Sequence, residues 1–160
     1  MAKVLIVYYS RSGNTKKMAE IVAQGVKEED VSVKVKGVEE TNVEEMLDYD
    51  GIIIGSPTYY GTLAWQVKKF FDESVKFHGR LNGKVGGAFT SSANIGGGNE
   101  TTILSIIQAL LIHGMVVQGN PSGDHYGAVA IDAPDVRARE NCLELGRRVG
   151  HLVKKISHGS

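Results

Sequence analysis

The sequence of 160 residues contains a single cysteine, Cys142. One cysteine excludes an internal disulfide and fits a reducing compartment, so we expect a cytoplasmic protein. The 18 basic and 18 acidic residues cancel to a formal net charge of zero. Because neither sign is in surplus, the chain lacks the electrostatic field that attracts nucleic acid or a membrane surface, and we expect neither as a partner.

Long apolar runs are also absent, since the longest ones have the length of a β-strand, and no membrane span is expected. No linker or internal repeat divides the chain. With 42% hydrophobic and 22% charged residues, the composition is typical of a soluble globular protein. We therefore assign residues 1–157 to a single domain and interpret residues 158–160 as a tail.

The chain also lacks the usual signatures of phosphate chemistry. It has no Gly-x-x-x-x-Gly-Lys-Ser/Thr loop, no Gly-x-Gly-x-x-Gly loop and no cysteine in a phosphatase loop. What is present is the apolar run 4–9 followed by Ser10-Arg11-Ser12-Gly13-Asn14-Thr15. This pattern indicates a buried strand, a tight turn and a helix whose first unpaired N–H groups can bind an anion. Hydroxyls without a lysine favour a permanently held phosphate, and the alternative is an ordinary turn capped by Ser12 or Asn14.

Strand and helix patterns alternate five times along the chain, which predicts an α/β fold with a doubly wound, five-stranded parallel sheet and helices on both faces. The expected strands are residues 4–9, 31–36, 51–55, 85–91 and 115–118, with 127–131 as an extension or an ordered loop. The expected helices are one beginning at Asn14, a short one opened by a capping box of Thr41 and Glu44, one with Leu63, Val67, Phe70, Phe71 and Val75 on its buried face, one ending at Gly114, and one beginning near Pro134.

The second strand alternates polar and apolar residues as an edge strand does, whereas the first and third strands are apolar throughout. This difference favours the strand order 2-1-3-4-5, in which the loops at 10–15 and 56–62 separate and leave a crevice. Tyr59 and Tyr60 offer aromatic rings to that crevice, although we expect one of the two to pack into the protein or to be exposed instead. The glycine-rich loop 92–100 offers backbone groups at close approach, with a disordered surface loop as the alternative.

The residues at 10–15 closely resemble the FMN phosphate loop of flavodoxins, which usually reads Ser/Thr-x-Ser/Thr-Gly-Asn-Thr. Three further segments are similar to the WrbA branch of the flavodoxin superfamily, the FMN-dependent NAD(P)H:quinone oxidoreductases. They are Ser56-Pro57-Thr58-Tyr59-Tyr60-Gly61, the loop from Ser91 to Glu100 with its Gly96-Gly97-Gly98, and His113-Gly114-Met115-Val116. The resemblance implies a flavodoxin-like fold, FMN as cofactor, NAD(P)H as electron donor and a quinone as acceptor.

The same resemblance implies the site residues. Ser12 would lie where nicotinamide arrives, and His113 would be a catalytic FMN contact, although without the resemblance it is typical of a histidine favoured by a helix C-terminus. We assign no metal site. The implied cofactor-binding residues are Ser10, Arg11, Ser12, Gly13, Asn14, Thr15, Pro57, Thr58, Tyr59, Tyr60, Gly61, Ser91, Ser92, Ala93, Asn94, Ile95, Gly96, Gly97 and His113.

The chain departs from this branch in its short connections at 38–50 and 119–126 and in Tyr59, which stands where the branch has arginine. We therefore expect a homodimer or a looser assembly instead of a tetramer. Two functions remain open. An enzyme would reduce a quinone with NAD(P)H, whereas a carrier would pass single electrons between redox proteins. The zero net charge favours the enzyme and the short connections favour the carrier. A phosphate-receiving signalling domain is excluded, because Ser10, Arg11 and Ser56 replace the acidic residues that it needs.

Overall fold

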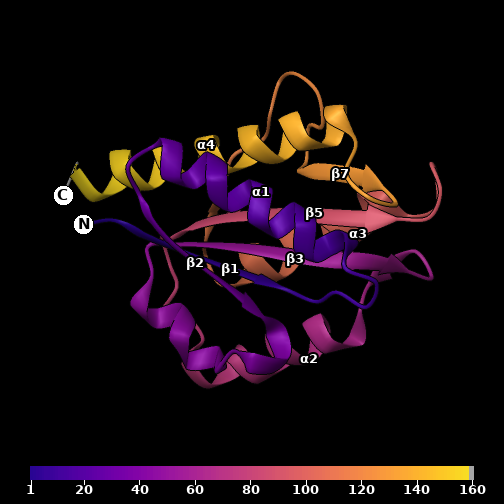
Figure 1. Ribbon diagram of the computed structural model, residues 1–160. Coiled ribbons are helices and arrows are strands. Elements are labelled where there is room, and N and C mark those ends of the chain that lie inside the picture. The colour runs from indigo at the N-terminus through magenta and orange to yellow at the C-terminus, as the bar shows by residue number, and fades with distance from the viewer. Residues whose placement is uncertain (159–160) are drawn as a thin grey trace.

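Parallel strands form the central layer of the structure, a computed structural model in which residues 1–158 are described (Figure 1). The strands are β1 (Lys3–Tyr8), β2 (Ser32–Gly37), β3 (Gly51–Tyr59), β5 (Val85–Ser92), β6 (Val116–Val117) and β7 (Ala128–Ile131). The order β2-β1-β3-β5-β6 confirms the predicted doubly wound topology. Val116 pairs with Val85 and Ala128 with Phe89, so β6 and β7 share the outer edge of β5. The segment 127–131 is therefore an extension of the fifth strand.

Helices cover both faces of this sheet, as predicted (Figure 1). One face carries α1 (Asn14–Glu28) and α4 (Val136–His158), and the other carries α2 (Trp65–Glu73), α3 (Asn99–Ile112) and the 3-10 helices η1 (Val38–Glu40), η2 (Val43–Asp48) and η3 (Ser74–Phe77). The two-residue strand β4 (Thr62–Leu63) folds back on the end of β3. In Figure 1 both termini lie at the left, and the carboxyl ends of the strands, with their loops, lie at the right. No helix within residues 1–158 has the length and apolar character needed to cross a bilayer.

The helices α1 and α4 meet backbone to backbone at two glycines. A Cβ built on Gly25 would lie 2.1 Å from the carbonyl oxygen of Leu143, and one built on Gly146 would lie 2.1 Å from that of Val22. No side chain fits between the helices at this point. The close approach buries Cys142 in the same core, which confirms its interpretation as a small apolar residue.

The predicted capping box is wrong by one residue. Asn42 caps η2, since its Oδ1 accepts from the Glu44 N–H at 3.3 Å and the Glu45 carboxylate accepts from the Asn42 N–H at 3.1 Å. The Thr41 hydroxyl instead donates to the Gly37 carbonyl at 2.7 Å. Because that bond uses the only proton of Thr41 to close η1, the next residue takes the cap.

Two other helix boundaries differ from the expectation. Leu63 belongs to β4, and α2 ends at Glu73, so Val75 falls in η3 and is 72% exposed. Pro134 lies outside α4, whose first turn is capped where the Asp135 carboxylate accepts from the Ala138 N–H at 2.8 Å. Of the predicted tail, His158 is the last residue of α4, and 159–160 lie outside the described residues.

Candidate functional site

The β1–α1 loop leaves the first turn of α1 without a side-chain cap. Gly13 is the residue before the helix, with a φ of 97° that a side chain would strain, and no cap bond is made there. The Gly13 N–H donates to Ser10 Oγ at 3.1 Å, which folds the loop back on itself. The expected alternative, a turn capped by Ser12 or Asn14, is therefore wrong. The N–H groups at the start of α1 are free to receive an anion.

The start of α1 is fixed against the end of β5. Thr15 is 1% exposed, and its Oγ1 lies 2.8 Å from Ser91 Oγ. A second link joins the strands, because the Tyr9 N–H donates to the Gly55 carbonyl at 3.1 Å. These bonds bring segments that are far apart in sequence to one rigid edge of the sheet.

An open cleft of about 280 Å³ lies among these loops. Ten of its lining residues come from the three predicted segments, namely Arg11, Ser12, Asn14, Thr15, Pro57, Thr58, Tyr59, Ser91, Ser92 and Ala93. The remaining one, Asp132, was missed from the sequence, and its N–H donates to the Ser92 carbonyl at 2.8 Å. The sequence could have indicated Asp132, because a strand at 127–131 that pairs with the fourth strand has to end at the edge of the sheet where the cleft lies.

The two tyrosines of the 56–62 loop lie in different environments. Tyr59 lines the cleft, is 37% exposed and packs edge-on against Tyr9, with ring centroids 6.4 Å apart. Burial raises the pKa of its phenol, so Tyr59 stays neutral at physiological pH and keeps a proton that it can donate to a ligand. Tyr60 is fully exposed, does not line the cleft and has a φ of 48°. Only Tyr59 is placed to contact a ligand in the cleft.

The glycine-rich loop is ordered by hydrogen bonds of its own. The Ser92 hydroxyl donates to the Asn94 carbonyl at 3.0 Å, and the Gly97 N–H donates to the same oxygen at 3.3 Å. The Gly96 N–H donates to Asn99 Oδ1 at 3.2 Å. The alternative of a disordered loop is therefore not what the structure shows. Asn94, Ile95, Gly96 and Gly97 are exposed beyond the lining of the cleft.

Two loops of the site are also in direct contact. The Thr101 hydroxyl donates to the Gly61 carbonyl at 2.6 Å. A Cβ built on Gly98 would lie 2.5 Å from Gly61 Cα, so glycine is needed for this approach. The 56–62 and 91–100 loops thus form one wall above the sheet.

His113 is not brought to this cleft. It follows α3, which runs back from the carboxyl ends of the strands, and β6 begins three residues later beside Val85 at the opposite edge. The His113 side chain is 6% exposed, and its Nε2 lies 2.6 Å from Ser74 Oγ. For a site formed within one chain, the prediction of His113 as a catalytic FMN contact is wrong. The reason is that the antiparallel course of α3 carries its C-terminus away from the cleft.

The surroundings of His113 are those of a structural histidine. Its ring stacks on Phe77 at 6.1 Å, and burial, followed by the neighbouring His78, lowers its pKa. Gly114 ends α3 as predicted, since its N–H donates to the Leu111 carbonyl at 2.9 Å and the Met115 N–H donates to that of Leu110 at 3.2 Å.

A parallel sheet of this order, with a hydroxyl-rich loop before α1 and a cleft between the ends of β1, β3 and β5, defines a flavodoxin-like protein. The family model described as "Flavodoxin domain" matches residues 5–97, more than half of the chain. The chain belongs to this family.

Curated relatives carry two kinds of name. A flavodoxin from Aquifex aeolicus is 41% identical over 162 aligned positions, which cover 96% of this chain and 88% of that protein. An NAD(P)H dehydrogenase (quinone) from Archaeoglobus fulgidus is 35% identical over 190 aligned positions, which cover 98% of this chain and 100% of that protein. Because this chain has 160 residues, that alignment includes segments which this chain lacks.

The solved structures similar to this chain likewise include flavodoxins and a WrbA-like protein. A flavodoxin from the domain Archaea superposes with a TM-score of 0.80 at 28% identity, covering 95% of this chain and 99% of that one. A WrbA-like protein from Agrobacterium tumefaciens superposes with a TM-score of 0.78 at 28% identity, covering 97% and 99%. The resemblance to flavodoxins and their WrbA-like branch is confirmed.

Proposed function

We propose that the protein binds FMN in the cleft and transfers electrons from NAD(P)H to a quinone. The observation that carries the proposal is the uncapped start of α1, which opens into the cleft beside Ser12 and Arg11. A permanently bound phosphate satisfies those N–H groups and also complements the helix dipole.

The residues present fit FMN. A Cβ at Gly13 would meet no atom within 4 Å, so the loop leaves open space where a phosphate fits. Backbone N–H groups at 14–16, the Ser12 hydroxyl and the Arg11 guanidinium would hold that phosphate. Tyr59 would contact one face of the flavin ring, and the backbone of 92–97 would meet its polar edge. FMN supplies the redox chemistry, and the protein supplies binding and orientation.

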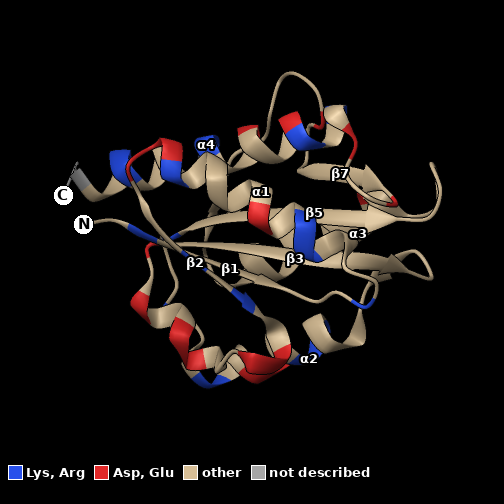
Figure 2. Ribbon diagram, viewed as in Figure 1, with Lys and Arg blue, Asp and Glu red and all other residues tan. Residues whose placement is uncertain are grey.

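The charges around the cleft favour small reactants. Figure 2 shows acidic residues concentrated on η1 and η2 and a mixture of acidic and basic residues along α4, whereas the loops at the carboxyl ends of the strands carry few charged residues. A strongly acidic rim would steer a basic partner protein to the flavin, and such a rim is not what this edge presents. NAD(P)H and a quinone that enter one after the other fit this open edge, in a cytoplasmic protein.

A one-electron carrier is the second candidate. It is favoured by the Aquifex flavodoxin, which aligns with this chain over 162 positions and therefore almost without insertions. In that function a redox protein would replace both small reactants.

Anaerobic mixing of the FMN-loaded protein with NADH or NADPH, followed by benzoquinone, tests the proposal. We expect the flavin absorbance to bleach with one or both nucleotides and to return with the quinone. Since donor and acceptor share one open edge, the steady-state kinetics should be ping-pong. If neither nucleotide bleaches the flavin and photoreduction proceeds in two separate one-electron steps, the enzyme is excluded and the carrier is supported.

A further inference from the structure

Asp132 is the one acidic residue among those that line the cleft, and it has no role in the function proposed above. It directly follows β7, and its N–H donates to the Ser92 carbonyl at 2.8 Å, which fixes its backbone to the wall of the cleft. Its φ of 56° is uncommon for a residue other than glycine, although aspartate and asparagine tolerate it. The side chain is exposed, so a ligand in the cleft can reach its carboxylate.

The Asp132 carboxylate has no partner in the protein, unlike the carboxylates near it in the sequence. Asp124 accepts from the Arg137 guanidinium at 2.8 Å, and Asp135 accepts from the Ala138 N–H at 2.8 Å. Within residues 1–158, no hydrogen bond or ion pair involves the carboxylate of Asp132. Its oxygens, which only accept hydrogen bonds when the group is ionised, are therefore available to a ligand.

Two hydroxyls that line the same cleft also have no proton to donate. The Thr90 hydroxyl donates to a backbone carbonyl of β3 at 2.6 Å, so the Thr58 hydroxyl donates its own proton to Thr90 Oγ1 at 2.9 Å. The Ser92 hydroxyl donates to the Asn94 carbonyl at 3.0 Å. Together with Asp132, these groups call for an uncharged part of a ligand that donates hydrogen bonds.

Asp132 lies next to the phosphate end of the cleft, but not at it. The phosphate end is the first turn of α1, where Thr15 Oγ1 lies 2.8 Å from Ser91 Oγ. The N–H of Asp132 binds the following residue, Ser92. In FMN, the group that follows the phosphate is the ribityl chain, which is uncharged and whose hydroxyls can donate to a carboxylate.

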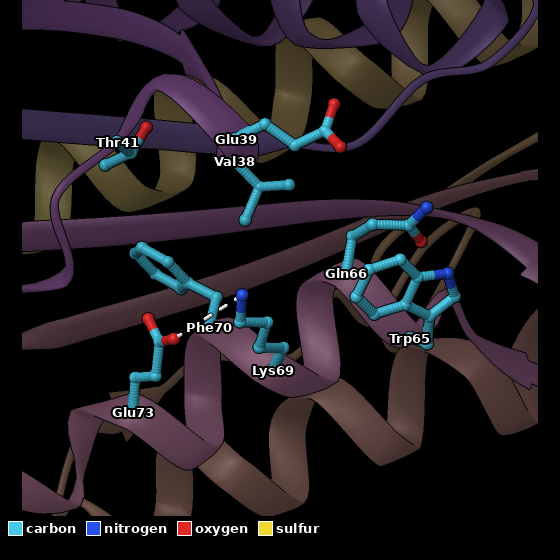
Figure 3. Close-up of a pocket in the computed structure, with 8 residues that line it drawn as sticks. All are labelled: Val38, Glu39, Thr41, Trp65, Gln66, Lys69, Phe70 and Glu73. Atoms are coloured by element: carbon cyan, nitrogen blue, oxygen red, sulfur yellow. Dashed lines mark ion pairs between the residues drawn. The ribbon is translucent and has the colours of Figure 1, made fainter.

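The cavity of about 320 Å³ between η1 and α2 shows that an unpaired carboxylate alone does not make such a site (Figure 3). The only cation in its lining, Lys69, lies 3.8 Å from Glu73, and Glu39 adds a second carboxylate. In the cleft, by contrast, Arg11 makes no ion pair with any residue of the described chain, 1–158. The cleft thus combines a free cation for a phosphate with Asp132 as an acceptor for hydroxyls.

We propose that Asp132 positions the flavin by accepting hydrogen bonds from the ribityl hydroxyls of FMN. The proposal rests on the FMN binding proposed above and adds a contact from the end of β7, outside the three loops that carry the rest of the site. Hydrogen bonds to a charged acceptor are about twice as strong as those between neutral groups. Asp132 is therefore a positioning residue that makes the site selective for flavins with a polyol chain.

Titration of the apoprotein with FMN, riboflavin and lumiflavin tests this contact, because lumiflavin carries a methyl group in place of the ribityl chain. Asp132→Asn keeps the size of the side chain and tolerates the same φ, but removes the charge. It should weaken FMN and riboflavin by the same factor, about fivefold, and leave lumiflavin unchanged. Asp132→Gly removes the acceptor and also adopts this φ, so the loss should reach about tenfold or more.

Asp30 provides a matched control. It is an exposed aspartate with a φ of 57°, and it follows the end of α1 that lies away from the cleft. Asp30→Asn and Asp30→Gly should leave the affinities for all three flavins unchanged. The thermal unfolding temperature of apoprotein Asp132→Asn should equal that of the wild type, because its carboxylate has no partner in the protein. Equal losses in the Asp30 and Asp132 variants would contradict the assignment.

The three flavins also show which part of the ligand is contacted. A change confined to FMN would place Asp132 at the phosphate, and a loss that includes lumiflavin would place it at the ring. Either result would overturn the ribityl contact, as would unchanged affinities for all three flavins.

Failure of this inference is distinguishable from failure of the proposed function. If the wild type and Asp132→Asn bind FMN equally, the ribityl contact is overturned and the FMN site stands. If the affinities change as expected but neither NADH nor NADPH bleaches the flavin, the ribityl contact is supported and the oxidation of NAD(P)H is overturned. If the wild type binds none of the three flavins, both are overturned.

Discussion

The Ser12 hydroxyl lies in the cleft beside the uncapped start of α1, where it would contact the phosphate of FMN. A hydrogen bond to a charged group contributes about 1.5 to 3 kcal/mol, so Ser12→Ala should weaken FMN about tenfold or more. Riboflavin, which has no phosphate, should bind the variant and the wild type equally. Titration of the apoprotein with both flavins measures this, with Ser32→Ala on the exposed edge strand as control. Equal losses for both flavins would contradict the assignment of the loop.

His113 illustrates how a single buried residue makes stability depend on pH. The Ser74 hydroxyl donates to the Phe71 carbonyl at 2.6 Å, so His113 Nε2–H donates to Ser74 Oγ and the buried Nδ1 has no partner among the described residues. A second proton would have to sit on Nδ1 in this buried position. Burial, and then His78, accordingly lower the pKa of His113.

Acid should therefore destabilise the protein through His113. Since the folded-state pKa is lowered, the unfolded chain takes up a proton that the folded protein resists. The contribution to stability is fully present above the ordinary pKa of about 6.5 and is lost as the pH falls below it, by at most about 1.4 kcal/mol per pH unit. Urea unfolding at a series of pH values measures the slope, which should be shallower in His113→Gln. An unchanged slope in that variant would show that other groups cause it.

At the scale of the elements, the contact between α1 and α4 depends on Gly25 and Gly146. In an isolated helix, Gly→Ala is favourable by about 1 kcal/mol, but here each new Cβ would lie 2.1 Å from a backbone carbonyl oxygen. The backbone cannot rotate away as a side chain can, so Gly25→Ala should cost about 3 kcal/mol in spite of its helix propensity. Thermal and urea unfolding of this variant measure the cost, with the exposed Gln24→Ala as the matched control. A stabilised Gly25→Ala would contradict the close approach.

The elements that the sequence predicted well are those in which apolar residues recur with a strong helical or strand periodicity. The buried strands, the helix from Asn14 and the strand order follow from apolar spacing, because one buried face is enough to fix them. The break of α2 into η3 at Ser74 has no such signal, since the Ser74 hydroxyl is held by Phe71 and His113, whose positions come from the tertiary fold. The shifted cap at Asn42 likewise depends on the bond that Thr41 makes to Gly37.

Within the site, the sequence identified the three loops that form the cleft, but it did not show which residues of each loop line it. The motif 91–97 was assigned as one unit, yet only Ser91, Ser92 and Ala93 line the cleft. His113 was assigned to the cleft, at the wrong edge of the sheet, because a sequence motif does not show at which edge its residues lie. Asp132 was missed because its approach depends on β7 pairing with β5.

At the scale of the whole molecule, an apolar surface is open to self-association. Val75 and Ile112 are 72% and 71% exposed, and both line a cavity of about 420 Å³ between α2, η3 and the end of α3. The connections at 38–50 and 119–126 are short, and the Archaeoglobus relative has segments that this chain lacks. These features favour a dimer or a looser assembly over a stable tetramer.

Light scattering over a range of protein concentrations should accordingly show dimers that dissociate on dilution. Burying an isoleucine side chain contributes about 1.5 to 3 kcal/mol, so Ile112→Lys should weaken the dimer about tenfold or more if this surface forms the contact. Val136→Lys changes a valine that is 86% exposed at the start of α4 and serves as the control. A tetramer that persists on dilution, unaffected by Ile112→Lys, would show that other surfaces hold the assembly together.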